Sequence, residues 1–135
     1  MTRVLLIDGD RALAQSVAMS CVEDGVAVRL AETLCEGVRY LLDGPVSVIL
    51  VDAGLMRLSG PEQVRLFDEV APGVPVVVLA PEGISVGESV RFQVQGFQVV
   101  SRPFEIREVL AKVESPGRSM PARAGAAARV EALCS

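Results

Sequence analysis

Val46-Ser-Val-Ile-Leu-Val-Asp52 is the stretch that decides how this chain folds. It is a nearly continuous apolar run, rich in β-branched residues, and Gly44-Pro45 separates it from the segment before it. Such a run is typical of a strand that is buried on both faces of a sheet. We therefore predict a strand at Val46–Val51 that ends at the acidic residue Asp52.

Similar runs lie on either side of this strand. Val4–Ile7 is a short apolar run that also ends at an aspartate, Asp8, and Pro75–Ala80 is a third buried run. Two weaker strand patterns are present at Val26–Leu30, which alternates apolar and polar residues, and at Val99–Ser101. The chain therefore contains five candidate strands.

Apolar residues at helical spacing separate and follow these strands. Thr33 with Glu36 fits a capping box, Gly25 fits a helix C-terminal glycine, and Gly87 lies inside the fourth helix, where it costs about 1 kcal/mol relative to alanine. We expect that fourth helix to be the loosest. The residues in helical register are Leu13, Val17 and Cys21; Leu34, Val38, Leu41 and Leu42; Val64, Phe67 and Val70; Val86, Val90 and Val94; and Ile106, Val109, Leu110 and Val113.

Strands that alternate with helices predict an α/β fold, a doubly wound parallel sheet of five strands with helices on both faces. We place this domain at residues 1–114. Residues 115–135 are rich in Pro, Gly, Arg and Ala, and we interpret them as a linker or C-terminal tail.

The composition excludes several classes of protein. The 135 residues are 50% hydrophobic with a formal net charge of −4, so the domain can bury a core and is not expected to bind nucleic acid directly. No apolar run approaches the ~20 residues of a membrane span, and Asp8 comes too early for a signal peptide, so we expect a cytoplasmic protein.

Cys21, Cys35 and Cys134 lack metal-site spacing and are interpreted as free thiols. The absence of histidine excludes Ser-His-Asp triads and imidazole zinc sites.

Acidic residues gather at one predicted edge of the sheet. Asp8 and Asp52 end two parallel strands, and Asp10 follows the first, so three carboxylates could converge where ligands bind in such sheets. Carboxylates that converge repel one another unless a proton or a hard cation such as Mg²⁺ compensates them. Two simpler readings stay open: Asp10 as a helix N-cap, and Asp8 and Asp52 as turn residues.

Four segments, taken in order, resemble the landmarks of the receiver domain of bacterial two-component response regulators. They cover residues 3–114 and are Val4-Leu-Leu-Ile-Asp8-Gly-Asp10, Val48-Ile-Leu-Val-Asp52-Ala-Gly-Leu-Met-Arg-Leu-Ser-Gly60, Val76-Val-Val-Leu-Ala80 and Ser101-Arg-Pro-Phe104. The resemblance implies a flavodoxin-like (βα)5 fold with strand order 2-1-3-4-5. It also implies a regulatory phosphoprotein that is not an enzyme beyond self-phosphotransfer.

In the family, the aspartate that matches Asp52 accepts a phosphoryl group from a histidine kinase. Mg²⁺ would be held by Asp8, Asp52 and the backbone carbonyl of Gly54, and the family lysine matches Arg102. Magnesium and lysine neutralise charge on the transferring oxygens.

Several positions depart from the family pattern. Gly9 replaces a second acidic metal ligand, for which Asp10 can substitute only if the loop bends. Three altered switch or charge positions are Ala80, which has no hydroxyl, Val99, which replaces an aromatic residue, and Arg102, whose guanidinium is not equivalent to an ammonium group. Met56 stands where the family has proline. Arg102 could also simply form a salt bridge to Asp52.

Two functions follow. The first is a degenerate receiver, a regulatory protein-interaction module with impaired phosphoryl acceptance and weak or absent Mg²⁺ binding. The alternative is a receiver that still accepts phosphate on Asp52. A nucleotide-binding or hydrolytic enzyme is disfavoured because there is no GxGxxG, P-loop or histidine base.

By resemblance, the partners are a histidine kinase or another signalling protein, an output domain beyond residue 135, and a second copy bound through the last strand and its flanking helices.

Overall fold

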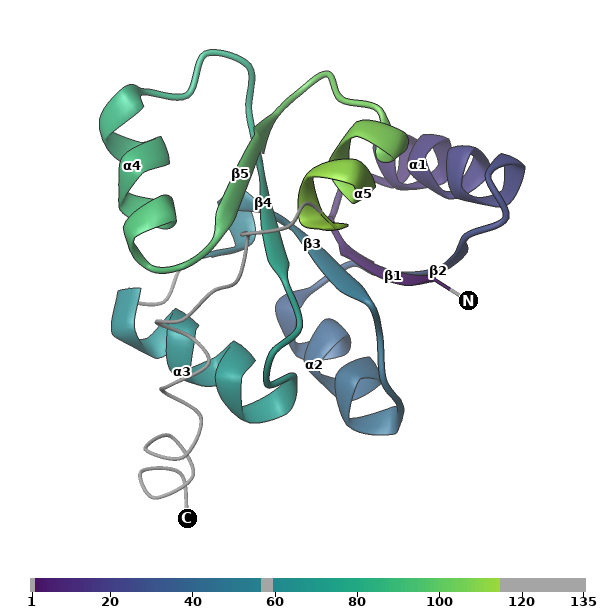
Figure 1. Cartoon of the computed structure of the whole chain (residues 1–135), viewed down its shortest axis with the longest axis horizontal. Coiled ribbons are helices and arrows are strands. Elements are labelled where there is room, and N and C mark those ends of the chain that lie inside the picture. The colour runs from purple at the N-terminus through teal and green to yellow at the C-terminus, as the bar shows by residue number, and fades with distance from the viewer. Residues whose placement is uncertain (1, 57–59, 115–135) are drawn as a thin grey trace.

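A computed structural model describes residues 2–56 and 60–114 of the chain (Figure 1). The predicted tail at 115–135 lies outside the described residues. The strands are β1 (Arg3–Ile7), β2 (Ala27–Ala31), β3 (Val48–Asp52), β4 (Val76–Ala80) and β5 (Gln98–Ser101). The helices are α1 (Arg11–Glu23), α2 (Leu34–Asp43), α3 (Gly60–Val70), α4 (Val86–Val94) and α5 (Ile106–Glu114), with a short 3-10 turn, η1 (Ala53–Leu55), after β3.

The five strands form one parallel sheet in the order β2-β1-β3-β4-β5, as predicted. The pairing of Ile7 with Val51 brings the carboxyl ends of β1 and β3 to the same edge of the sheet. The next residue of each chain segment is an aspartate, Asp8 and Asp52. The backbone register alone therefore places these two acidic residues side by side.

Helices cover both faces of the sheet, with α1 and α5 on one face and α2, α3 and α4 on the other (Figure 1). Because strand residues alternate between faces, each central strand contributes to two separate cores. One core contains Leu5, Ile7, Ile49, Val51, Val76 and Val78 with Leu41 and Phe67 from α2 and α3. The other contains Val4, Leu6, Val48, Leu50, Val77 and Leu79 with Val17 and Cys21 from α1 and Ile106 and Val109 from α5.

The predicted helix ends are confirmed, with one difference in α2. Gly25 follows α1 with a positive φ of 71°, a conformation that glycine adopts without strain. Thr33 Oγ1 accepts the backbone N–H of Glu36 at 3.1 Å, as a capping box requires. The Glu36 carboxylate, however, accepts from the backbone N–H of Glu32 instead of returning to Thr33. The reciprocal half of the box is thus displaced by one residue.

One predicted helix stripe, that of α4, does not face the core. In α4, the side chains of Val86, Val90 and Val94 are 80%, 47% and 76% exposed, and Phe92 packs against the core instead. The helix carries apolar residues on two sides, and the larger aromatic ring takes the buried side, where it removes more apolar surface from water. No residue of α4 is fully buried, which agrees with the expectation that this helix is the loosest.

In α2, Leu41 is buried but Leu42 is exposed. Adjacent residues lie about 100° apart around a helix, so one stripe cannot include both.

Among the described helices, none is both long enough and apolar enough to cross a bilayer.

Candidate functional site

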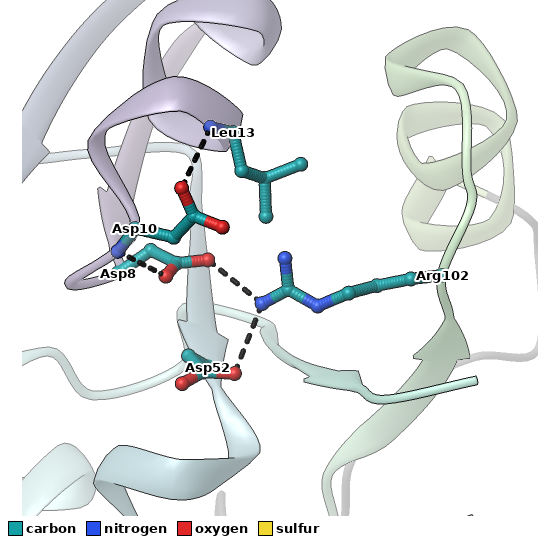
Figure 2. Close-up of polar contacts among 5 residues, drawn as sticks. All are labelled: Asp8, Asp10, Leu13, Asp52 and Arg102. Carbon is teal, nitrogen blue, oxygen red and sulfur yellow. Dashed lines mark hydrogen bonds and ion pairs between the residues drawn. The ribbon is translucent and has the colours of Figure 1, made fainter. Parts of the chain in front are cut away.

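One nitrogen of Arg102 joins the two aspartates at the edge of the sheet (Figure 2). Arg102 Nη2 lies 2.7 Å from Asp8 Oδ2 and 2.9 Å from Asp52 Oδ1. Both contacts are ion pairs as well as hydrogen bonds. The predicted salt bridge between Arg102 and Asp52 is therefore present, and it extends to Asp8, which the sequence did not indicate.

The fold brings these residues together from three different strands. Asp8 follows β1, Asp52 ends β3, and Arg102 follows β5, on the other side of β4. The backbone N–H of Arg102 bonds to the carbonyl of Ala80 at 3.0 Å and continues the pairing of β4 with β5 by one residue. The long Arg102 side chain then reaches across the end of β4 to both carboxylates.

The three side chains of this ion-pair cluster are largely shielded from solvent. The side chain of Asp8 is only 2% exposed, while those of Arg102 and Asp52 are 22% and 28% exposed. Burial alone would lower the pKa of the Arg102 guanidinium, but its hydrogen bonds and charge attraction to Asp8 and Asp52 together raise that pKa above its ordinary value. Arg102 is therefore a permanent cation that balances one of the two carboxylates.

Asp10 does not join the cluster. Its carboxylate accepts the backbone N–H of Leu13 at 3.2 Å and caps α1, while its own N–H donates to Asp8 Oδ1 at 2.9 Å (Figure 2). The expected convergence of three carboxylates is wrong in this respect, because the unsatisfied amides of the first turn of α1 bind the third one. Asp10 instead uses its backbone to orient Asp8.

Most of the carboxylate oxygens that could bind Mg²⁺ at this edge of the sheet are already engaged. Within residues 2–56 and 60–114, no group of three or more acidic, cysteine or histidine side chains is close enough to hold a metal ion. The Asp8 oxygens bond to the Asp10 amide and to Arg102, and one Asp52 oxygen also bonds to Arg102. A hard cation needs several free oxygens, so this arrangement does not fit Mg²⁺ while Arg102 occupies the carboxylates.

The other predicted positions surround this cluster. Gly9 is exposed beside Asp8, and a Cβ there would meet nothing closer than the Glu32 carbonyl oxygen at 3.7 Å. Ala80 is fully buried at the end of β4, and Val99 is partly buried in β5. Gly54 follows Asp52 in η1, where a Cβ would lie 3.1 Å from Asp52 Oδ2. A side chain at position 54 would therefore crowd the Asp52 carboxylate.

Two buried polar side chains of α3 were not predicted. Gln63 and Asp68 of α3 are both nearly inaccessible, and Gln63 Nε2 donates to Oε1 of Gln95 at the end of α4 at 3.0 Å. Gln63 lies one helical turn before the buried Phe67, so helical spacing could have identified its position. Because glutamine is usually exposed, the sequence analysis did not include Gln63 among the buried residues.

Comparison with known protein families gives one match along most of the chain. The family described as "Response regulator receiver domain" matches residues 4–114. Among curated proteins, the transcriptional regulatory protein YkoG of Bacillus subtilis is 26% identical over 83% of this chain and 49% of its own length. GlrR of Escherichia coli is 28% identical over 76% of this chain and 23% of its own length. The chain thus spans half or less of these relatives.

Solved structures support the fold. A response regulator from Burkholderia pseudomallei, described with a phosphorylated aspartic acid, a calcium ion and citrate, matches with a TM-score of 0.72 and 23% identity, over 100% of this chain and 74% of its own. The chemotaxis response regulator CheY4 of Vibrio cholerae matches with a TM-score of 0.72 and 20% identity, over 84% of this chain and 98% of its own. At these identities the likeness concerns the fold alone.

Proposed function

The chain belongs to the response regulator receiver domain family of two-component signalling, and we propose that it is a degenerate member whose acceptor aspartate is held in a salt bridge. In this proposal it acts as a regulatory protein-interaction module, and its acceptance of a phosphoryl group on Asp52 is impaired. The observation that carries the proposal is the bridge from Arg102 Nη2 to both Asp8 and Asp52.

The bridge competes directly with a divalent cation. Arg102 supplies positive charge to the same two carboxylates that would hold Mg²⁺, and it does so within hydrogen-bonding distance. A cation would have to displace it and would then find no carboxylate at Gly9 and only a capping carboxylate at Asp10. Mg²⁺ binding is therefore weak or absent in this proposal, and Asp8, Asp52 and the Gly54 carbonyl are a metal site only after Arg102 moves.

The groups that would stabilise a transferring phosphoryl group are also reduced. Ala80 supplies no hydroxyl, and Arg102 replaces a compact ammonium group with a guanidinium already bonded to two carboxylates. Preorganised donors of this kind are each worth about 2.7–4 kcal/mol in other active sites. Two such losses are enough to slow phosphoryl transfer by several orders of magnitude without disturbing the fold.

The alternative is a receiver that accepts phosphate on Asp52. One observation favours it, namely that the Asp52 side chain is 28% exposed and so remains accessible to a donor. In that case Arg102 would release Asp52 and use its charge on the phosphoryl oxygens. Both functions are regulatory, with self-phosphotransfer to Asp52 as the most that this domain would catalyse.

The partners follow from the family. We propose a histidine kinase or another signalling protein as the input partner and an output domain elsewhere in the full protein, since the relatives YkoG and GlrR are named transcriptional regulatory proteins and are longer.

Two free cysteines, Cys21 and Cys35, fit a reducing cytoplasm. The acidic net charge leaves nucleic-acid binding to other parts of the protein.

The surface proposed for a partner or a second copy comprises β5 with α4 and α5. On α4, the exposed residues Val86, Val90 and Val94 form an apolar row of the kind that marks interaction sites. Replacing all three with glutamine should reduce any self-association measured by sedimentation and leave the fold intact, because none of them is buried.

A phosphorylation assay tests the proposed function. The protein is incubated with Mg²⁺ and a small-molecule phosphoryl donor, or with beryllofluoride, and is followed by intact mass and NMR, with Asp52→Asn as the matched control. We expect no stoichiometric phosphorylation and no saturable beryllofluoride shifts at millimolar Mg²⁺. Stoichiometric modification that the Asp52→Asn variant lacks would establish the alternative.

A further inference from the structure

A concave site lies at the opposite end of the sheet from Asp52. It is a hollow of about 250 Å³ between the start of β1, strand β2 and the carboxyl end of α2. Its charged lining residues are Arg3, Arg29 and Asp43, and Tyr40 contributes an aromatic ring. This volume is just below the range of about 300–1,000 Å³ that holds drug-sized ligands, so the hollow suits a small metabolite.

The two arginines reach the hollow because of the sheet register. Arg3 pairs with Ala27, and Arg29 is two residues further along β2, so both side chains lie on the face of the sheet that α2 covers. Among the described residues, neither arginine forms an ion pair with an acidic side chain. Two guanidinium groups that line one hollow of an acidic protein form a local site for an anion.

Tyr40 holds one of these arginines in place. The Arg29 guanidinium carbon lies 4.3 Å from the centre of the Tyr40 ring, within the range of a cation–π contact. Stacking uses the flat face of the guanidinium and leaves the N–H groups along its edge available. A carboxylate, like a phosphate, matches such an edge with two parallel hydrogen bonds.

The other side of the hollow has the opposite polarity. Asp43 is the last residue of α2, and the carbonyl groups of the last helical turn have no partner within the helix. A carboxylate beside the negative end of a helix dipole attracts a cation. Apolar contact between these two charged regions is provided by Pro45 and Val46.

We propose that this hollow binds a small zwitterion with an apolar side chain, of the α-amino acid class. The ligand carboxylate would bond to Arg3 and Arg29, its ammonium group to Asp43 and the end of α2, and its side chain would lie on Pro45, Val46 and Tyr40. This assignment uses every charged group that lines the hollow. It gives the domain a ligand input that is independent of Asp52.

Three matched probes test the site in the ¹⁵N-labelled protein by NMR titration. L-Phenylalanine carries both charges, 3-phenylpropionate lacks the ammonium group, and phenethylamine lacks the carboxylate; L-leucine and L-valine serve as smaller amino acids. We expect saturable shifts with an amino acid at β2 and the end of α2, and binding at least about tenfold weaker when either charge is missing, since each removes charge-assisted hydrogen bonds.

Two substitutions of accessible residues assign the charges. Arg29→Gln should weaken amino-acid and phenylpropionate binding about tenfold and leave phenethylamine unchanged. Asp43→Asn should weaken amino-acid and phenethylamine binding and leave phenylpropionate unchanged. Arg65→Gln on α3, outside the hollow, is the control for both, and Asp52→Asn should bind as the wild type does, which separates this result from the fate of the proposed function.

Absence of saturable shifts with all three amino acids would overturn the proposal. So would equal affinity for L-phenylalanine and 3-phenylpropionate, because the ammonium contact would then contribute nothing. Saturable shifts centred on Asp8 and Asp52 instead of β2 would place the ligand elsewhere and contradict it equally.

Discussion

Asp8 and Arg102, 94 residues apart in the chain, form a 2.7 Å ion pair in which the aspartate side chain is only 2% exposed. A buried carboxylate of this kind depends on its partner, because removing one member of a buried pair leaves an uncompensated charge. The same guanidinium nitrogen also bonds to Asp52. The candidate acceptor and its neighbour are thus connected through a single side chain.

The first prediction concerns the loss of Arg102. Arg102→Met keeps a long side chain but removes the charge, and it leaves Asp8 buried beside a second carboxylate. We expect the free energy of unfolding to fall by about 3 kcal/mol, measured by urea denaturation. Added Mg²⁺ should restore part of this loss in the variant and have little effect on the wild type, since a ligand stabilises the state to which it binds.

Arg11→Met is the control for this experiment. Arg11 pairs with Glu32 at 2.8 Å, but both side chains are largely exposed, so its loss should cost about 0–1 kcal/mol. If Arg102→Met were no more destabilising than Arg11→Met, the bridge would not hold the site together.

The second prediction restores the groups that the family uses. The triple variant Gly9→Asp, Ala80→Ser, Arg102→Lys adds an acidic ligand, a hydroxyl and an ammonium group. Gly9 has room for a side chain, because the nearest atom to a Cβ there is 3.7 Å away. We expect Asp52 phosphorylation by a small-molecule donor to become at least about 100-fold faster than in the wild type, measured by intact mass.

A variant with Gly9→Asn in place of Gly9→Asp matches the shape without the charge and should gain much less. A triple variant that stays as unreactive as the wild type would show that these departures are not what limits phosphoryl acceptance.

The third prediction concerns the packing of α2 on the sheet. A Cβ at Gly37 would lie 2.8 Å from Ile7 Cγ1 and would also clash with Ile7 Cδ1. Ile7 is fully buried in β1, directly before Asp8. Gly37→Ala should therefore lower the free energy of unfolding by about 1–3 kcal/mol through overpacking.

Gly87→Ala in α4 should have the opposite sign. Nothing lies within 4 Å of a Cβ at that position, so the variant gains helix propensity and should be about 0.5–1 kcal/mol more stable. Equal effects of the two substitutions would contradict the close approach of α2 to β1.

The fourth prediction concerns the thiols, studied in a Cys134→Ser background. Burial, and secondarily the charge of Asp24, raise the pKa of the Cys21 thiol, whereas Cys35 is exposed. A maleimide should label Cys35 rapidly at pH 7 and label Cys21 only when the protein unfolds. Equal labelling rates in the native protein would show that α1 does not cover Cys21.

The raised pKa of Cys21 also gives stability a defined pH dependence. As pH rises, the unfolded chain releases the thiol proton first, near its ordinary pKa of about 8.5, while the folded protein still retains it. This contribution is thus fully present below that pH and is lost as pH rises through the higher folded-state pKa. Denaturation curves of wild type and Cys21→Ala should converge above about pH 8.5, and parallel pH profiles would contradict this expectation.

Local sequence patterns were sufficient for the five parallel strands and for placing the two aspartates at one edge of the sheet. Runs such as Val4–Ile7 and Val48–Val51 are apolar at every position, which only strands buried on both faces require. Parallel strands end at the same edge, which put Asp8 and Asp52 on one side of the sheet. That β1 and β3 are direct neighbours was implied by the family resemblance and is confirmed by the strand order. The caps at Asp10 and Thr33 are equally local, since each bonds to an amide three residues away.

The partners of the functional side chains were decided only by the tertiary structure. Whether Arg102 pairs with Asp52 alone or also with Asp8 depends on the reach of one side chain across β4, a relationship that no spacing along the chain encodes. The same is true of α4, where periodicity allowed either the valine row or Phe92 to face the core. Short-range periodicity determines which residues form strands and helices, but contacts between side chains from distant segments depend on how those elements pack.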